Sequence, residues 1–191
     1  MSNPGIHSEL DTIEKIRLGD VETFSQLFRR YYKPLCMFAA RFTRDFDAAE
    51  NIVQEVFVKL WDGRESLSVE VSLKGYMYAS VRNSCLNYIK RESLSSTLER
   101  VEGRSNETTT RPDIQLESSE ISQTVERAIN KLPPKRREIF CMAKYDDLSY
   151  QEIAEIQNVS VNTVKTQLKR ALKTLAKSLQ YMHIVLLLLT I

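Results

Sequence analysis

Residues 147–175 read Asp-Leu-Ser-Tyr-Gln-Glu-Ile-Ala-Glu-Ile-Gln-Asn-Val-Ser-Val-Asn-Thr-Val-Lys-Thr-Gln-Leu-Lys-Arg-Ala-Leu-Lys-Thr-Leu, and this stretch predicts two helices joined by a tight turn. Ser149 and Glu152 have the spacing of a capping box, in which the hydroxyl and the carboxylate each accept from an otherwise unpaired backbone amide. The first helix should end at about Asn158, and Ser160 is a favourable N-cap for the second. The pattern therefore predicts a helix-turn-helix.

The second of these helices has two different faces. Its apolar residues recur at helical spacing and must face a core: Val164, Leu168, Ala171, Leu172 and Leu175. Residues 160–180 contain five lysine or arginine residues and no acid. Long donors at the start of such a helix can reach base edges in the major groove, and later lysines can reach phosphates. A solvated basic face on an ordinary amphipathic helix is the alternative, but cap, turn and charge together favour double-stranded DNA.

The composition limits the class of protein. The chain has 191 residues, of which 42% are hydrophobic and 27% charged, as is ordinary for a soluble globular protein of one domain or two small ones. The formal net charge of +2 hides an uneven distribution. Residues 131–177 carry ten lysines and arginines against five acids, whereas residues 92–120 carry three arginines against seven acids. We expect the basic end and the acidic middle to have different roles.

Several functional classes have little support in the sequence. Cys36, Cys85 and Cys141 are far apart and odd in number, so they predict neither a disulfide framework nor a zinc site, and they favour a reducing cytoplasm. His7 and His183 lie at opposite ends, without a cysteine or carboxylate cluster. We find no phosphate-binding glycine loop, no nucleophile with its base and no signal peptide. We therefore expect no enzymatic activity, metal, cofactor or small-molecule substrate.

The rest of the chain predicts an all-α fold of two small helical domains. Residues 1–91 form the first. Asp20 should cap one of its helices, and a capping pattern at Asp47 and Glu50 starts another that runs to about Trp61. A loop follows over 62–72, where glycine and serine interrupt the periodicity, and a further helix runs from Leu73 to Arg91.

The second domain should span residues 120–180 and contain the helix-turn-helix. Residues 92–119 predict a flexible acidic linker, because 92–117 are rich in Ser, Thr and Glu and show no apolar period. The apolar tail 181–191 is far shorter than the ~20 residues that span a bilayer. We expect this tail to pack on the second domain, with binding to a partner or a membrane surface as the alternative.

Three segments in this order resemble the bacterial RNA polymerase sigma factors of the two-domain extracytoplasmic-function (ECF) type, within the sigma-70 family. Asp47-Ala-Ala-Glu-Asn-Ile-Val-Gln-Glu-Val-Phe-Val-Lys-Leu-Trp61 is similar to the helix that docks on the polymerase clamp. Leu73-Lys-Gly-Tyr-Met-Tyr-Ala-Ser-Val-Arg-Asn-Ser-Cys-Leu-Asn-Tyr-Ile-Lys-Arg91 is similar to the segment that reads and opens the minus-ten element. Leu132-Pro-Pro-Lys-Arg-Arg-Glu-Ile-Phe140 with the helix-turn-helix is similar to the minus-thirty-five-binding domain.

The resemblance implies a role for particular residues. The contacts to core RNA polymerase would come from Asp47, Glu50, Asn51, Gln54 and Glu55. The minus-ten element would meet the loop from Asp62 to Ser72, Arg82 and Asn83, with Tyr76 and Tyr78 as either base platforms or core residues. The minus-thirty-five element would meet Asn162, Thr163, Lys165, Thr166, Gln167, Lys169 and Arg170. Gln167 departs from the arginine frequent at this position, which leaves the base read there open.

The implied function is to direct core RNA polymerase to a set of promoters, with polymerase, promoter DNA and an anti-sigma factor as partners. The alternative is an autonomous helix-turn-helix regulator that never joins the polymerase. The helix over 47–61 separates the two, because a free regulator has no reason to place those carboxylates and amides opposite an apolar stripe. The promoter sequence, the inducing signal and the identity of an anti-sigma factor do not follow from the sequence.

Overall fold

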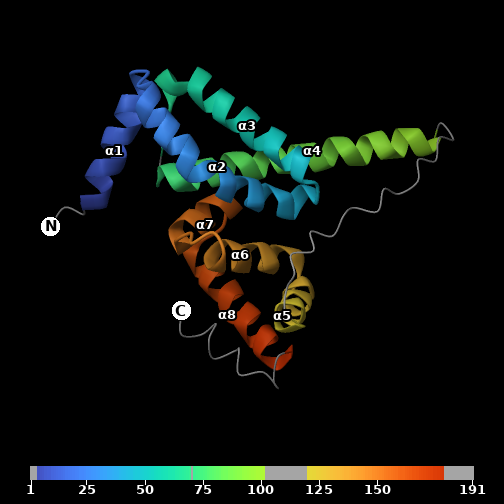
Figure 1. Cartoon of the computed structure of the whole chain (residues 1–191). Coiled ribbons are helices and arrows are strands. Elements are labelled where there is room, and N and C mark those ends of the chain that lie inside the picture. The colour runs from blue at the N-terminus through green and yellow to red at the C-terminus, as the bar shows by residue number, and fades with distance from the viewer. Residues whose placement is uncertain (1–3, 70, 102–119, 179–191) are drawn as a thin grey trace. The chain divides into compact units, whose positions relative to one another are not determined.

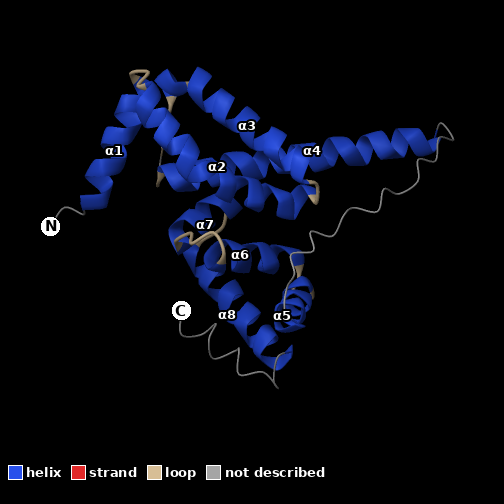
Figure 2. Ribbon diagram, in the orientation of Figure 1, coloured by secondary structure: helices blue, strands red, loops and turns tan. Residues whose placement is uncertain are grey.

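The computed structural model describes residues 4–69, 71–101 and 120–178, and within these residues every regular element is a helix (Figures 1 and 2). The predicted all-α fold is confirmed. The chain divides into two compact units, Met1–Arg111 (unit 1) and Pro112–Ile191 (unit 2). The apolar tail 181–191 and residues 102–119 lie outside the described residues.

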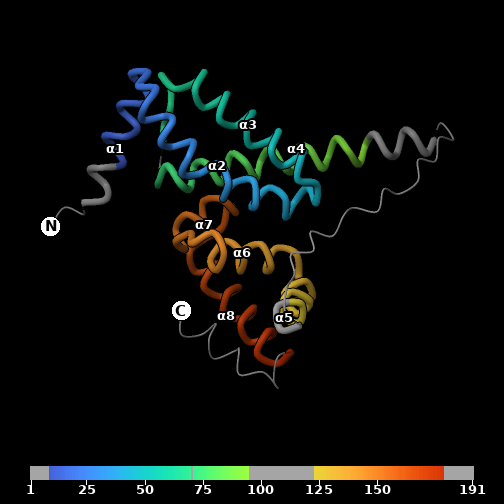
Figure 3. Tube along the Cα trace, viewed as in Figure 1, coloured from blue at the N-terminus to red at the C-terminus, as the bar shows by residue number. Residues whose placement is uncertain are grey.

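Unit 1 is organised around α2 (Val21–Thr43), which packs against both α3 (Phe46–Asp62) and α4 (Leu73–Val101). α1 (Pro4–Arg17) precedes α2, and a 3₁₀ turn, η1 (Arg64–Ser66), lies between α3 and α4. Figure 3 follows this order along the Cα trace. The side chains that close the core come from all four α-helices: Ile16, Leu35, Phe38, Val53, Phe57, Met77 and Val81.

The helix starts of unit 1 confirm one expected cap and correct another. Asp20 accepts from the backbone amide of Thr23 at 2.9 Å and caps α2. The cap of α3 is Asp45, whose carboxylate accepts from the amide of Ala48 at 3.1 Å. The prediction that Asp47 is the cap was wrong, because α3 begins at Phe46 and Asp47 already lies in its first turn. Both aspartates are compatible with a helix start, so the sequence pattern did not separate them.

The end of α4 is a second correction. Residues 92–101 fall within the predicted linker, but α4 continues through them to Val101. The absence of an apolar period does not exclude a helix, because the period reports only an apolar stripe and not the backbone conformation. Residues 92–101 contain no glycine or proline, and Gly103 follows only after the helix has ended.

Unit 2 consists of α5 (Glu120–Asn130), α6 (Pro134–Lys144), α7 (Tyr150–Gln157) and α8 (Val161–Ser178). α8 packs against each of the other three. The core of unit 2 includes Leu132, Phe140, Met142, Ile153 and Val164. Proline occupies the first turn of α6, where its missing amide costs nothing because that amide has no helical partner.

The helix-turn-helix has the predicted caps. In α7 the amide of Glu152 donates to the Ser149 hydroxyl at 3.2 Å, and the amide of Ser149 donates to the Glu152 carboxylate at 2.7 Å. Asn158 ends this helix in the left-handed conformation, with φ of 51°. Ser160 then accepts from the amide of Thr163 at 3.1 Å and so caps α8. In the part of the chain that the structure describes, no helix is long and apolar enough to cross a membrane.

The corrected cap of α3 gives a direct test. Asp45→Ala should lower the free energy of unfolding of unit 1 by about 1 kcal/mol, because it removes the acceptor for the Ala48 amide. Asp45→Asn should retain most of this stability, since asparagine caps about as well as aspartate. Asp47→Ala should lower the free energy of unfolding by less, because it removes only a favourable charge near the helix N-terminus. Urea denaturation followed by circular dichroism measures all three, and equal losses for the two alanine variants would contradict the assignment.

Cys85 gives a second test, through pH. Burial raises the pKa of this thiol from its usual 9.0 to about 12. The unfolded state therefore loses this proton first, so the stability from the neutral thiol is fully present below pH 9.0 and declines as pH rises toward about 12. Cys85→Ala lacks this dependence, so the difference in unfolding free energy between parent and variant should shrink over that range. A difference that stays constant with pH in denaturant titrations would show that Cys85 ionises equally easily in both states.

Candidate nucleic-acid and polymerase interfaces

The surface of α8 carries the strongest candidate for DNA binding. Its buried stripe, Val164, Leu168, Ala171 and Leu175, fixes the rotation of the helix. Six of the seven predicted residues are exposed on the remaining surface, which we call the recognition face: Asn162, Thr163, Lys165, Thr166, Lys169 and Arg170. Lys173 and Lys177 are exposed further along the same helix. The face therefore presents short polar groups at the N-terminus of α8 and cations along its length.

Gln167, the seventh predicted residue, is held differently. It is half-buried, and its side-chain oxygen accepts from Nε of Arg136 on α6 at 3.1 Å. Arginine has no acceptor, so this contact orients the amide with its oxygen toward α6 and leaves its NH₂ group as the free end. The sequence analysis placed Gln167 with the other DNA-facing residues and did not anticipate this contact.

The helices that support α8 are joined by a further polar contact. Gln157, at the end of α7, donates to the Glu138 carboxylate of α6 at 2.8 Å. Both residues are only part-exposed, so the hydrogen bond ties the first helix of the helix-turn-helix to the helix before it. The position of the recognition face thus depends on α6 as well as on the helix-turn-helix itself.

In unit 1 the predicted polymerase-binding residues form one continuous face on α3. Asp47, Asn51, Gln54 and Glu55 are exposed and Glu50 is half-buried, and we call these five residues the docking face. Opposite them, Val53, Val56 and Phe57 are buried in the core of unit 1. The structure therefore brings all five predicted residues together on one side of one helix.

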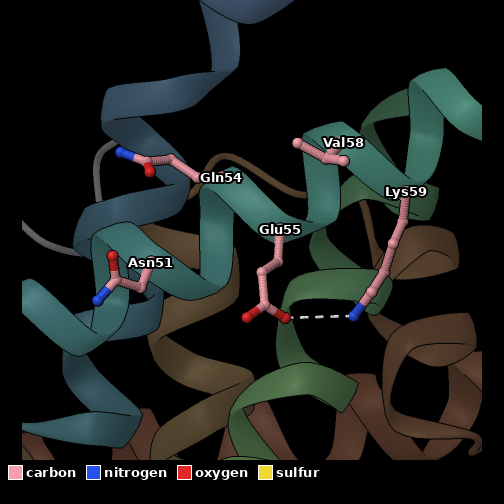
Figure 4. A pocket seen from close by; sticks show the side chains of 5 residues that line it. All are labelled: Asn51, Gln54, Glu55, Val58 and Lys59. Atoms are coloured by element: carbon pink, nitrogen blue, oxygen red, sulfur yellow. Dashed lines mark hydrogen bonds and ion pairs between the residues drawn. The ribbon is translucent and has the colours of Figure 1, made fainter.

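Figure 4 shows that Asn51, Gln54 and Glu55 line a shallow pocket together with Val58 and Lys59. Lys59 makes an ion pair with Glu55 at 3.3 Å, but both side chains are about 70% exposed, so it contributes little stability. Gln54 donates to the hydroxyl of Tyr32 on α2 at 3.2 Å. Val58 is 59% exposed and was missed by the sequence analysis. The position of Val58 outside the apolar stripe of α3 is the sequence feature that could have identified it as an exposed residue.

The predicted minus-ten residues of α4 separate into core and surface. Tyr78 is 2% exposed, and its ring packs edge to face on Phe38 with the centroids 5.0 Å apart. Tyr78 is therefore a core residue, and its alternative role as a base platform was wrong. Tyr76 and Arg82 are half-buried and Asn83 is exposed. Tyr76 and Asn83 are seven residues apart, so they lie on nearly the same side of the helix.

Of the predicted loop over 62–72, the structure describes residues 62–69 and 71–72, and side-chain contacts hold the chain on both sides of this gap. Arg64 stacks over the ring of Trp61 at 4.6 Å and donates to the Trp61 carbonyl at 2.8 Å. Leu67 is buried, and its carbonyl accepts from Nε of Arg17 on α1 at 2.9 Å. At the other end of the loop, the amide of Leu73 donates to the Glu9 carboxylate. These contacts join residues 50 and 64 positions apart, so the sequence pattern indicates no role for α1.

The described residues contain no group of three His, Cys, Asp or Glu side chains that could hold a metal ion. The site residues are instead arranged as three polar surfaces on rigid helices: the recognition face of α8, the docking face of α3, and the start of α4 with its preceding loop. Polar surfaces of this kind bind macromolecules through many shallow contacts.

Two family models match the chain at these surfaces. The model of sigma-70 region 2 matches residues 27–94, which include the docking face and most of α4. The model of sigma-70 region 4 matches residues 122–175, which include α6, the helix-turn-helix and the recognition face. Together the two matches cover more than half of the chain.

Known sigma factors match over nearly their whole length. RNA polymerase sigma factor YlaC of Bacillus subtilis is 27% identical over 160 residues, which are 83% of this chain and 92% of that protein. ECF RNA polymerase sigma factor SigW of the same organism is 27% identical over 177 residues, which are 88% of this chain and 95% of that protein. ECF RNA polymerase sigma-E factor of Escherichia coli is also 27% identical over 177 residues, with 88% and 92% covered.

Solved structures show the same fold. The sigma factor RpoE of Bartonella quintana, in complex with the anti-sigma factor NepR, matches with a TM-score of 0.62 and 24% identity over 84% of this chain and 99% of that one. CnrH in complex with the cytosolic domain of CnrY matches with a TM-score of 0.63 and 19% identity over 90% and 97%. With both regions matched in order along one chain, this protein belongs to the sigma-70 family and, within it, to the sigma factors of the extracytoplasmic-function type.

Proposed function

We propose that this sigma factor directs core RNA polymerase to its promoters through three surfaces with separate tasks. The docking face of α3 binds the polymerase, the loop over 62–72 with the start of α4 reads the minus-ten element, and the recognition face of α8 reads the minus-thirty-five element. The observation that carries the proposal is the recognition face, where exposed donors and cations lie opposite a fully buried stripe.

The chemistry of the recognition face suits duplex DNA. Lys165, Lys169 and Arg170 are exposed on α8, and residues 160–180 contain no acid to neutralise them. Asn162 and Thr163 stand at the N-terminus of α8, the part of a recognition helix that commonly enters the major groove. Backbone phosphates then fix the register of the helix, and base edges determine the sequence that is preferred.

The docking face suits a protein partner. Its carboxylates and amides lie on α3, whose opposite side packs against α2. There the ring of Phe57 contacts the rings of Phe24 and Phe28. The exposed Val58 adds an apolar contact at the edge of an otherwise polar patch. An exposed apolar side chain among polar ones is a common feature of protein interfaces. We infer that Val58 and Lys59 extend the polymerase contact beyond the five predicted residues.

For the minus-ten element we propose that Arg82, Asn83 and Tyr76 act with the loop from Asp62 to Ser72, which forms the wall of a pocket for a flipped base. Flipping a base costs a few kcal/mol, and edge contacts with stacking can return a similar amount. Tyr78 has no part in this, because its ring lies in the core.

We also propose an anti-sigma factor as a regulatory partner, because the sigma factor RpoE, which has a similar fold, was solved in complex with the anti-sigma factor NepR. The chain acts by binding and carries out no reaction of its own in this proposal. Its place of action is the cytoplasm, where polymerase and promoter DNA are found.

The recognition face is tested by Lys165→Ala and Arg170→Ala. Each should weaken binding of the polymerase holoenzyme to its promoter, because each removes an exposed cation from the face that meets DNA. A base-edge contact should cost ~1–3 kcal/mol and relax specificity at one position, whereas a phosphate contact should weaken all sequences alike and lower the salt slope by about one. Salt-dependent filter binding on promoter and control DNA measures both effects.

Lys131→Ala is the matched control, because Lys131 is an exposed lysine of the same unit that lies outside the recognition face. The control should leave the affinity and the salt slope nearly unchanged. If all three variants behaved alike, overall charge rather than the recognition face would govern binding.

The docking face is tested by the triple variant Glu50→Ala, Asn51→Ala, Gln54→Ala. These side chains lie outside the core, and such surface changes usually alter stability by less than ~0.5 kcal/mol each. The variant should keep its helical circular dichroism and melting temperature, yet lose co-purification with core polymerase and promoter-specific transcription.

Glu22→Ala with Gln26→Ala is the control, since these are an exposed glutamate and an exposed glutamine four residues apart on α2, with the same spacing as Glu50 and Gln54 on α3. A folded triple variant that still bound core polymerase as tightly as this control would refute the docking role. It would also favour the alternative of an autonomous regulator.

A further inference from the structure

We propose that α1 is a strap that sets the conformation of the loop between α3 and α4, and that Glu9 and Arg17 are positioning residues for reading the minus-ten element. The inference rests on the proposed function, in which the loop from Asp62 to Ser72 forms the wall of the base pocket. It assigns a task in promoter reading to a helix that lies before the residues matched by the region 2 model.

The first anchor is Arg17, at the end of α1. Its Nε donates to the carbonyl of Leu67 at 2.9 Å, and its Nη2 donates to the same oxygen. Leu67 is the residue at which the 3₁₀ turn η1 ends, and its side chain is buried. Two donors of one rigid guanidinium on one carbonyl fix the direction of that peptide group. The start of the loop segment over 67–72 is therefore held by α1.

The second anchor is Glu9, in the middle of α1. Its carboxylate accepts from the amide of Leu73, the first residue of α4. The first amides of a helix have no helical acceptor, and a carboxylate there is also favoured by the helix dipole. The hydroxyl of Ser72 accepts a hydrogen bond from another of these amides, that of Gly75, at 2.9 Å. Glu9 and Ser72 together fix where α4 begins, and so where the loop ends.

The two anchors lie on one face of α1. Glu9 and Arg17 are eight residues apart in one helix, which places them about 12 Å apart along its axis. Between them Ile13 and Ile16 are buried, with exposed fractions of 6% and 0%. The positions 9, 13, 16 and 17 follow the i, i+4, i+7, i+8 pattern of one helix face. The apolar pair therefore holds α1 on the rest of unit 1, and Glu9 and Arg17, which flank that pair in the sequence, hold the loop.

This arrangement has a consequence for base reading. A loop that is ordered only when DNA binds must lose its conformational entropy at that moment, at roughly 1–2 kcal/mol per residue fixed. A loop that α1 already holds in place loses less conformational entropy when DNA binds. A larger fraction of the molecules is therefore able to accept a flipped base. Removing an anchor should lower the preference for the correct base while leaving polymerase docking through α3 unchanged.

The test uses the full chain assembled with core polymerase. Transcription is compared from a parent promoter and from a library in which each minus-ten base is replaced. In Glu9→Ala and Arg17→Met, the preference at one position of this element should fall by roughly threefold to tenfold, the factor produced by one lost hydrogen bond. Glu9→Gln and Arg17→Lys, which keep an acceptor and a donor, should retain part of the preference. Binding to core polymerase and the preference within the minus-thirty-five element should stay at the parent value.

Glu14→Ala is the matched control, because Glu14 is an exposed carboxylate of the same helix and is not one of the two anchors, so its loss should leave the base preference unchanged. Hydrogen exchange adds a readout that does not depend on transcription: the amides of residues 64–73 should exchange faster in Glu9→Ala and Arg17→Met than in Glu14→Ala. Variants with faster loop exchange but unchanged base preference would overturn the inference, and so would unchanged exchange. A parent chain that failed to start transcription at all would instead refute the proposed function, while the exchange result would still report on the strap.

Discussion

The burial of one apolar stripe on each helix is the constraint on which the binding surfaces depend. In α8 the buried stripe consists of Val164, Leu168, Ala171 and Leu175. Only one rotation of the helix about its axis buries all four side chains, and in that rotation the cations are exposed. In α3 the burial of Val53, Val56 and Phe57 similarly turns the carboxylates and amides outward. The polar faces thus owe their positions to residues that never touch a partner.

Local signals were sufficient to predict much of this from the sequence. The capping box at Ser149 and the cap at Asp20 involve atoms three residues apart, so spacing alone identified them. The recognition face followed from helical periodicity and from the absence of acids around it. Where two residues satisfied the same local rule, as Asp45 and Asp47 did, the pattern could not choose between them. The choice depends on where the chain leaves α2, which is a matter of packing.

Other features could not be predicted because they are decided by tertiary contacts. Tyr78 is a core residue since Phe38 of α2 lies against its ring, and helix periodicity in α4 is too weak to show it. Gln167 is turned toward Arg136 by a contact that spans 31 positions. The anchors from α1 to the loop span still more of the chain. In each case the contact joins residues far apart in the chain, so local spacing gives no signal for it.

The three buried cysteines have a practical consequence. Cys36 and Cys85 lie in α2 and α4 of unit 1, and Cys141 lies in α6 of unit 2, all with exposed fractions of 8% or less. A thiol in such a position reacts with a labelling reagent only while its surroundings are open. The rate at which each sulfur is modified in the intact chain therefore measures the free energy of opening of its own segment. The protein carries internal probes for both units, and the effect of polymerase, DNA or a regulatory partner on the stability of each unit can be followed without any engineered label.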